Sequence, residues 1–357
     1  MKLSDREWKD FAVPYVFQNI QRGKRLKKAD HILGIVPYVS STANNNGVDA
    51  YIEATKGTRV FENCISLANS GSVGTAFYEP FAFVASDHVT SLKRENTSQY
   101  VYLFLTAVLE QQGSNFNFNR EINDLRIRKM RVMLPVDDND EPDYQFMEDY
   151  MKELMVAKRK QYQEYVEQRL AELGIDAKNT KVGGYNLDLE SRNYKPFRLS
   201  DIFKIDKGVY LPKWNIVSGD KPFITAKAGD NGISRFIGND TLFSSGKITV
   251  EKIKLSSYYQ PQGFYCSHDV SVLDIGNANE YMAQFICTMI MRNSSKYSYG
   301  RQAQMNVVKR EVILLPVNDN DEPDYEFMEE CGRKMMARKY IQYLKYLESA
   351  CESKDVE

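Results

Sequence analysis

An internal repeat constrains this chain more than any other feature of its sequence. Residues 133–149 (MLPVDDNDEPDYQFMED) align without a gap to residues 314–330 (LLPVNDNDEPDYEFMEE), at an offset of 181 positions. The same offset holds upstream, where Phe104 aligns with Phe285, and it drifts to 186 near the start of each half. Because similar residues recur in the same order along both halves, the sequence predicts a tandem duplication of one unit.

The two copies have diverged unevenly. The connector around residues 133–149 is nearly identical in both copies, whereas residues 49–77 and 234–258 share little beyond their hydrophobic pattern. We therefore expect the connector to contact something that both halves share, and the variable segments to contact different things.

Each copy begins with extended, aromatic-rich sequence that predicts a β-rich domain. Asn46-Gly47 and Asn231-Gly232 predict turns between strands. Helices are expected at residues 98–110 and 280–291. Strands are expected at residues 35–39, 64–67, 81–85, 223–224, 247–250 and 270–273. The fold class is thus α+β, with two β-rich domains in a pseudo-two-fold repeat.

A long helix follows each domain, beginning after a Pro-Asp pair. About 30 residues span about 45 Å, and apolar residues three and four positions apart form one stripe per helix. Neither helix can bury its stripe alone, so we expect an antiparallel, coiled-coil-like pair that separates the domains. The residues expected in helix packing or partner docking are Phe146, Met147, Met151, Leu154, Tyr162, Tyr165, Phe327, Met328, Met335, Tyr343 and Tyr346.

These patterns divide the chain into five segments. The predicted segments are a first domain at 1–143, a helix at 144–174, a linker at 175–194, a second domain at 195–324 and a helix at 325–357.

Charge alternates along the sequence. The chain carries a net charge of −1, but residues 1–132 carry +4, residues 133–190 carry −7, residues 191–313 carry +7 and residues 314–357 carry −5. Two basic bodies between acidic connectors suit contact with a polyanion. Glu-rich helices beside Lys-rich β domains would give the same alternation without any such contact.

Composition excludes several classes of protein. The chain has five scattered cysteines and no CxxC pair, which is typical of free thiols and gives no metal site. It has no secretory h-region and no apolar stretch long enough to span a membrane. We expect a cytoplasmic protein.

Catalytic motifs are also missing. There is no Asp/Asn-Pro-Pro-Tyr/Phe tetrapeptide and no glycine-rich methyl-donor motif, and the P-loop-like residues 246–249 have Thr241 where the first glycine belongs. His31, His88 and His268 lack metal-ligand spacing and are expected in packing or at the surface. The acidic residues 137–143 lack the pattern of a Ca²⁺ loop and predict a solvated turn.

The order of domain, long helix, domain and long helix resembles the specificity subunits of type I restriction–modification systems. The LPV–EPDY–FME connector is especially similar to the specificity subunits of type IIB systems. Further shared motifs are FRLSDIFKIDKG at 197–208, the turns at 45–47 and 230–232, and Ser70–Gly74. The resemblance extends from Trp8 to the last helix.

This resemblance implies a non-catalytic subunit that binds double-stranded DNA. Each β-rich domain would be a target recognition domain for one half of an asymmetric, bipartite site. The helices would set the spacer and dock methyltransferase subunits, expected to be two, or fused methyltransferase–nuclease subunits; a restriction subunit is a further possible partner. S-adenosylmethionine, and Mg²⁺ for cleavage, would bind those partners, and no cofactor or metal is expected in this chain.

Basic and amide side chains of the two domains are the candidate DNA contacts, because such groups bind phosphates and base edges. Arg120 and Arg301 occupy equivalent positions and are expected to share one role, holding a phosphate or a structural carboxylate. A solvated surface charge is the alternative for any single lysine. The full set is Arg22, Lys24, Arg25, Lys27, Lys28, Asn45, Asn46, Arg120, Arg126, Arg128, Lys207, Lys213, Lys227, Asn231, Arg235, Lys296 and Arg301.

Another class of function remains open from the sequence. The repeated helices could make the chain a scaffold or inhibitor that binds two partner subunits without recognising DNA. A single-chain enzyme is disfavoured by the missing motifs.

Overall fold

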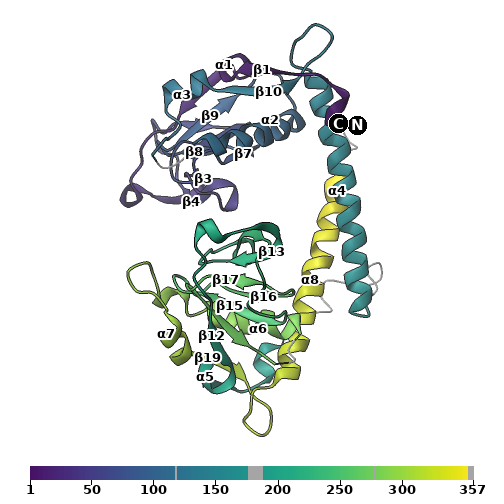
Figure 1. The fold of residues 1–357 in the computed structure, drawn as a ribbon. Coiled ribbons are helices and arrows are strands. Elements are labelled where there is room, and N and C mark those ends of the chain that lie inside the picture. Colours follow the sequence, from purple (N-terminus) through teal and green to yellow (C-terminus); the bar gives the residue numbers. More distant parts are fainter. Residues whose placement is uncertain (117–118, 176–187, 277–278, 353–357) are drawn as a thin grey trace. The chain divides into compact units, whose positions relative to one another are not determined.

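The computed structural model describes residues 1–116, 119–175, 188–276 and 279–352. It divides the chain into two compact units, Met1–Tyr162 and Gln163–Glu357. The boundary between them falls inside the first long helix (Figure 1). Most of the predicted linker, residues 176–187, lies outside the described residues.

The first sheet of the first unit is antiparallel, with the strand order β2-β9-β6-β7. Strand β6 is buried on both faces. Ile65 and Leu67 pack into the core that helix α2 covers, whereas Cys64 packs into the core of the second sheet. These elements are β2 (Asn19–Arg22), β9 (Val89–Lys93), β6 (Cys64–Ala68), β7 (Ala76–Glu79) and α2 (Gln99–Gln112).

The second sheet has the order β4-β3-β8-β5 and is mixed. Strands β3 and β8 are parallel, and the other pairs are antiparallel. Its strands are β4 (Val48–Ile52), β3 (Leu33–Val39), β8 (Phe83–Ala85) and β5 (Val60–Phe61).

A two-stranded sheet joins the start of the unit to its end. Strand β1 (Trp8–Ala12) pairs antiparallel with β10 (Arg131–Pro135). Short helices α1 (Val13–Val16) and α3 (Asp124–Lys129) flank this pair in the sequence. The pairing therefore places the first residues of the unit beside the connector that follows β10.

The second unit repeats this plan, except that an isolated bridge between Phe243 and Phe264 stands where the first unit has β5. Its sheets have the orders β12-β18-β15-β16, β14-β13-β17 and β11-β19. The strands are β11 (Tyr194–Arg198), β12 (Lys204–Lys207), β13 (Ser218–Ile224), β14 (Ile233–Ile237), β15 (Lys247–Glu251), β16 (Ser257–Gln260), β17 (Tyr265–Cys266), β18 (Val270–Asp274) and β19 (Val312–Pro316). The helices are α5 (Leu199–Ile202), α6 (Glu280–Met291) and α7 (Met305–Arg310). Short 3-10 turns are η1 (Leu3–Asp5), η2 (Lys28–Asp30), η3 (Asn45–Gly47), η4 (Gly113–Asn115), η6 (Leu189–Ser191), η7 (Lys213–Asn215), η8 (Asp230–Gly232) and η9 (Ser294–Lys296).

The duplication and the α+β class are thus confirmed, and every predicted strand is present. Helix α6 has the predicted bounds, and α2 begins and ends within two residues of its predicted bounds. Helices α3 and α7, and the pairing of β1 with β10, were not predicted.

The two Asn-Gly turns connect β3 to β4 and β13 to β14, as predicted. In the first, Asn45 and Asn46 have φ of 51° and 50°, and Gly47 has 76°. The second repeats this at residues 230–232. Asparagine, aspartate and glycine tolerate this left-handed backbone better than other residues, so the backbone alone accounts for these residue types.

Long helices α4 (Tyr144–Glu172) and α8 (Tyr325–Glu352) begin at the predicted residues. Within the second unit, the last turns of α4 run alongside α8 in the opposite direction (Figure 1). Val166 and Leu170 of α4 are buried there, and the Tyr165 ring meets the Tyr340 ring edge-on at 6.3 Å.

The apolar stripes differ from the prediction in detail. The side chains of Phe146, Met147, Phe327 and Met328 are buried, and those of Met151, Leu154 and Tyr162 are half-buried. The side chains of Tyr165, Met335, Tyr343 and Tyr346 are exposed. Ala337 and Ile341 are buried in α8 instead, and the pattern of large residues had missed them.

No helix within the described ranges is both long and apolar enough to span a membrane.

Candidate nucleic-acid interface and helix connector

Asp143 organises the first connector. Its Oδ1 accepts a hydrogen bond of 2.8 Å from the backbone N–H of Phe146, which caps the start of α4. Its Oδ2 accepts one of 2.8 Å from Nε of Arg6, just before β1. The Arg6 guanidinium lies 5.0 Å from the centre of the Phe146 ring. One carboxylate therefore joins the start of the unit to the start of the long helix.

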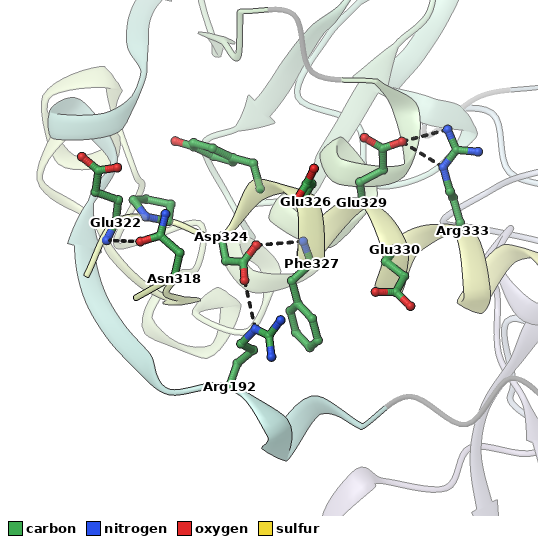
Figure 2. Close-up of a pocket in the computed structure, with 11 residues that line it drawn as sticks. Arg192, Asn318, Glu322, Asp324, Glu326, Phe327, Glu329, Glu330 and Arg333 are labelled. Carbon is green, nitrogen blue, oxygen red and sulfur yellow. Dashed lines mark hydrogen bonds and ion pairs between the residues drawn. The ribbon is translucent and has the colours of Figure 1, made fainter. Parts of the chain in front are cut away.

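Asp324 makes the same contacts in the second connector (Figure 2). It accepts 3.0 Å hydrogen bonds from the Phe327 N–H and from Arg192 Nε. The Arg192 guanidinium lies 5.0 Å from the centre of the Phe327 ring. These residues line an open, acidic hollow of about 1050 Å³.

The polar loop before each helix is held by hydrogen bonds from its backbone N–H groups to one of its own side chains. Asp137 Oδ1 accepts from the N–H groups of Asn139 and Glu141, and Asn318 repeats this in the second copy. The hydrogen bond from the Glu141 N–H helps to lower the pKa of Asp137. No cluster of His, Cys, Asp or Glu in the described part of the chain could hold a metal ion.

These contacts change the interpretation of the connector. The sequence suggested that its near identity reflects a shared partner. The structure shows that Asp143 and Asp324 make the same contacts inside each unit, with an arginine and with the start of the long helix. Internal contacts are therefore a second reason for the near identity, beside the shared partner that the sequence predicts.

An apolar hollow of about 560 Å³ lies between α6, α8 and β19 of the second unit. Phe285, Met289, Met335 and Met336 are among the residues that line it. In the first unit Trp8 and Tyr150 pack against Phe104, the counterpart of Phe285. Of the predicted docking residues, Met335 therefore lines an apolar concavity.

The basic residues of the first unit fall into two groups. Lys24, Arg25, Lys27 and Lys28 are exposed on the segment between β2 and β3. The second group makes intramolecular contacts. Arg22 belongs to it, because it donates to the Asp87 carbonyl at 2.5 Å and lies 3.8 Å from the Asp124 carboxylate.

Helix α3 carries further basic residues. Arg126 donates to the Glu121 carbonyl at 2.6 Å, and Arg128 is exposed.

In the second unit, Lys207, Lys213 and Arg235 are exposed. Lys227 forms an ion pair of 2.5 Å with Asp230 and so supports turn η8. Lys296 forms an ion pair of 2.6 Å with Glu311, whose buried carboxylate also accepts from Tyr297. Lys296 therefore has a structural role that the sequence did not suggest.

The asparagines of the turns are not equally free. Asn231 Nδ2 donates to the Tyr259 carbonyl at 3.1 Å and to Gln260 Oε1 at 3.2 Å. Asn45 and Asn46 occupy the equivalent turn of the first unit. The side chain of Asn231 thus connects its turn to β16 by hydrogen bonds.

Arg120 and Arg301 do not share one contact. Arg120 lies 5.7 Å from the centre of the Phe116 ring. Arg301 forms a backbone bridge with Ser298. In the described residues, neither guanidinium has an ion pair with a carboxylate, so the shared role stays a prediction.

Histidines lie in packing or at the surface, as expected. His31 meets Tyr38 edge-on at 4.5 Å, and His88 Nδ1 lies 2.6 Å from Ser70 Oγ. His268 is exposed beside Tyr210.

Sequence reasoning missed a buried carboxyl group. Glu79 is fully buried at the end of β7, where it accepts a 2.9 Å hydrogen bond from Ser66, and burial raises its pKa to about 7. Within the described residues its Oε2 has no hydrogen-bond partner. The equivalent residue of the second unit is Gln260, which donates to the carbonyl of Asn231 at 3.1 Å. Comparing the two copies at this position could have revealed the difference.

Comparison with known proteins accounts for both units. The model of the type I restriction modification DNA specificity domain matches residues 5–164 and again residues 191–344. Together these ranges cover most of the sequence. The chain belongs to this family. It is a DNA-binding specificity subunit of a restriction–modification system, and such subunits are non-catalytic.

Individual relatives of the specificity subunit are distant. The specificity subunit S.BcgI of a type II restriction enzyme from Heyndrickxia coagulans is 24% identical over 306 residues, which is 84% of this chain and 85% of that protein. The type I S subunit from M. genitalium is 14% identical, with a TM-score of 0.41 over 99% of this chain and 96% of that one. The HsdS subunit from Thermoanaerobacter tengcongensis is 11% identical, with a TM-score of 0.30 over 98% and 92% of the two chains.

Proposed function

We propose that the two units of this specificity subunit recognise the two halves of an asymmetric, bipartite DNA site. The observation that carries the proposal is that the units share their fold but differ in the exposed side chains of equivalent segments. Lys24, Arg25 and Lys27 of the first unit correspond to Val209, Tyr210 and Pro212 of the second. Equal frameworks with unequal surfaces suit two different half-sites.

The long helices are proposed to set the spacer and to dock methyltransferase subunits. At 1.5 Å per residue, the 29 residues of α4 span about 44 Å. This is somewhat more than one turn of B-DNA, about 34–36 Å. The apolar hollow at Met335 and the exposed Tyr343 and Tyr346 are surfaces on which a protein partner could pack.

The partners follow from this assignment. We propose two methyltransferase subunits or fused methyltransferase–nuclease subunits, in the cytoplasm, with a restriction subunit as a further partner. S-adenosylmethionine, and Mg²⁺ for cleavage, would bind to those subunits.

Methylation mapping of the source genome, with and without this gene, tests the proposal. A split motif that loses methylation on deletion is expected, and it would give both half-sites and the spacer. An unchanged methylation map would contradict the proposal.

A charge-removal variant separates DNA recognition from a purely scaffolding role. Replacing Lys24, Arg25, Lys27 and Lys28 by alanine should weaken DNA binding and leave assembly with the methyltransferase intact. These side chains are exposed, so the fold should tolerate the change. DNA binding that is unaffected by the change would favour the scaffold.

A further inference from the structure

The second unit exposes aromatic side chains on one hairpin and on the segment before it. Trp214 is 83% exposed in η7, and Phe236 is 53% exposed on β14. Tyr210 is also exposed, and its ring lies edge-on to His268 at 5.4 Å. Exposed aromatic side chains that gather in one region of a folded unit indicate a contact surface.

The first unit exposes apolar side chains in the corresponding region. Leu33 and Ile35 on β3 are each 90% exposed, and Tyr51 on β4 is exposed as well. Tyr51 and Phe236 are structural equivalents, because Tyr51 pairs with Pro37 in β3 and Phe236 pairs with Pro222 in β13. Exposure at the same strand position in both copies indicates a shared use.

The segment that carries Trp214 is ordered. Asn239 donates to the Asn215 carbonyl at 2.9 Å and accepts from the Val217 N–H at 3.0 Å, so it holds both sides of the turn. The start of the segment packs closely against a neighbouring backbone at Gly208, because a Cβ there would lie 2.2 Å from the Ser267 carbonyl oxygen. Trp214 is therefore presented to solvent by a fixed backbone, which lowers the entropic cost of binding.

The charge beside these side chains favours a polyanion. Residues 208–237 carry four basic and two acidic residues, and Lys213 directly precedes Trp214. Residues 23–52 of the first unit likewise carry four basic and two acidic residues. Apolar side chains flanked by cations suit duplex DNA, because the cations bind phosphates while the apolar groups meet bases in a groove.

We infer that the β13–β14 hairpin with residues 208–217 is the base-contacting surface of the second unit, and that β3–β4 with residues 23–32 is that of the first. Trp214 and Phe236 lie against bases, and Lys213 binds a flanking phosphate. This inference rests on the proposed function and adds to it the residues that determine specificity.

Fluorine NMR tests the contact directly. The specificity subunit, labelled with 5-fluorotryptophan and assembled with unlabelled partners, has only Trp8 and Trp214 to observe. Trp8→Phe assigns the two signals. On addition of a duplex with the mapped site, the Trp214 signal should shift and the Trp8 signal should not. A Trp214 signal that stays unchanged at saturating DNA would overturn the inference.

Affinity measurements supply the energetic test. Trp214→Ala and Phe236→Ala should each weaken binding of the mapped site by roughly 10-fold, the usual effect of one lost base contact. Tyr299→Ala is the matched control, because it removes an 81% exposed ring of the same unit outside the hairpin. The melting temperatures of all three variants should stay close to that of the wild type.

The outcomes separate the two proposals. A wild-type complex that prefers no split site refutes the proposed function. If complexes that carry Trp214→Ala and Phe236→Ala bind the site as tightly as the wild-type complex does, only the inference is refuted. The inference is also refuted if Tyr299→Ala weakens DNA binding as much as they do. Loss of partner assembly in the Trp214→Ala variant would assign the surface to protein contact and would likewise overturn the inference.

Discussion

Asp143 and Asp324 show how a single residue can maintain a repeated sequence motif. Each caps a long helix and holds an arginine from the start of its unit. Replacement of either would remove the side-chain cap of the helix N-terminus and the ion pair of the arginine. This requirement exists in both units whether or not a partner protein binds the connector.

Asp324→Ala should lower the free energy of unfolding by about 1–2 kcal/mol, the usual cost of a lost helix cap. Urea denaturation measures the change. Lys195→Ala is the control, since Lys195 is exposed and forms an exposed ion pair with Asp321, and such pairs contribute about 0–1 kcal/mol. Equal effects of the two substitutions would contradict the capping role.

Glu79 predicts a pH dependence of stability. Its folded pKa of about 7 lies above its ordinary value of 4.5, so the folded state binds the proton more tightly. Stability should therefore fall as pH rises from about 4.5 to 7 and stay low above that. At pH 8, Glu79→Gln should raise the melting temperature by an amount that corresponds to about 1–3 kcal/mol in the free energy of unfolding. At pH 5 it should change the melting temperature little.

Gln260→Glu is the matched control in the other copy. It places a carboxyl group at the equivalent buried position and removes the hydrogen bond that Gln260 donates to the Asn231 carbonyl, so the loss of stability at high pH should be at least as large. Melting curves of Glu79→Gln that are parallel to the wild type at every pH would show that the buried carboxyl does not titrate in this range.

Helices α6 and α8 of the second unit approach each other closely at a glycine. A Cβ at Gly332 would lie 2.2 Å from the Tyr281 carbonyl oxygen of α6. The equivalent residue of the first unit is Met151. The two long helices therefore cannot pack in the same way against their own units.

Gly332→Ala should force α8 away from α6 and destabilise the second unit by about 1–3 kcal/mol, as overpacking does. Thermal denaturation gives the loss. Gly300→Ala is the control, because a Cβ at Gly300 meets nothing within 4 Å. If Gly332→Ala melts at the same temperature as Gly300→Ala, the close approach of the helices is not needed for stability.

The elements that were predictable from sequence are those with a long or repeated signal. The duplication, the long helices from residues 144 and 325, and the central strands could all be predicted. Helices α3 and α7 could not, because six residues with two or three basic side chains carry little periodicity. The close contact at Gly332 was also hidden, since a glycine inside a helix does not reveal its neighbour.

The candidate site was only partly predictable for a related reason. Basic residues could be identified as a set, but not which of them serve the fold, as Lys296 does with Glu311. Leu33 and Ile35 were assigned to or beside a strand, yet their exposure runs against the usual burial of apolar residues. Only the structure shows that these side chains lie outside the core.

In the whole molecule, the two units are proposed to act as independent recognition modules on a common framework. The units share the order of their equivalent strands, connector geometry and turn conformation. They differ in surface side chains and in the packing of their long helices. A unit moved to the other position should therefore keep its own half-site.

The most direct measurement is methylation mapping of a chimera in which residues 191–324 are replaced by residues 5–143 from the first unit. The account predicts that the asymmetric motif is replaced by one built from two copies of the first half-site. The chimera also carries Gly332→Met, because the core of the first unit packs against Met151 at the equivalent position. The assembled complex with the methyltransferase should be recovered, since the inserted residues 133–143 and the retained residues 325–330 restore a complete connector. An unchanged asymmetric motif from the assembled chimera would contradict the claim that each unit recognises one half of the DNA site.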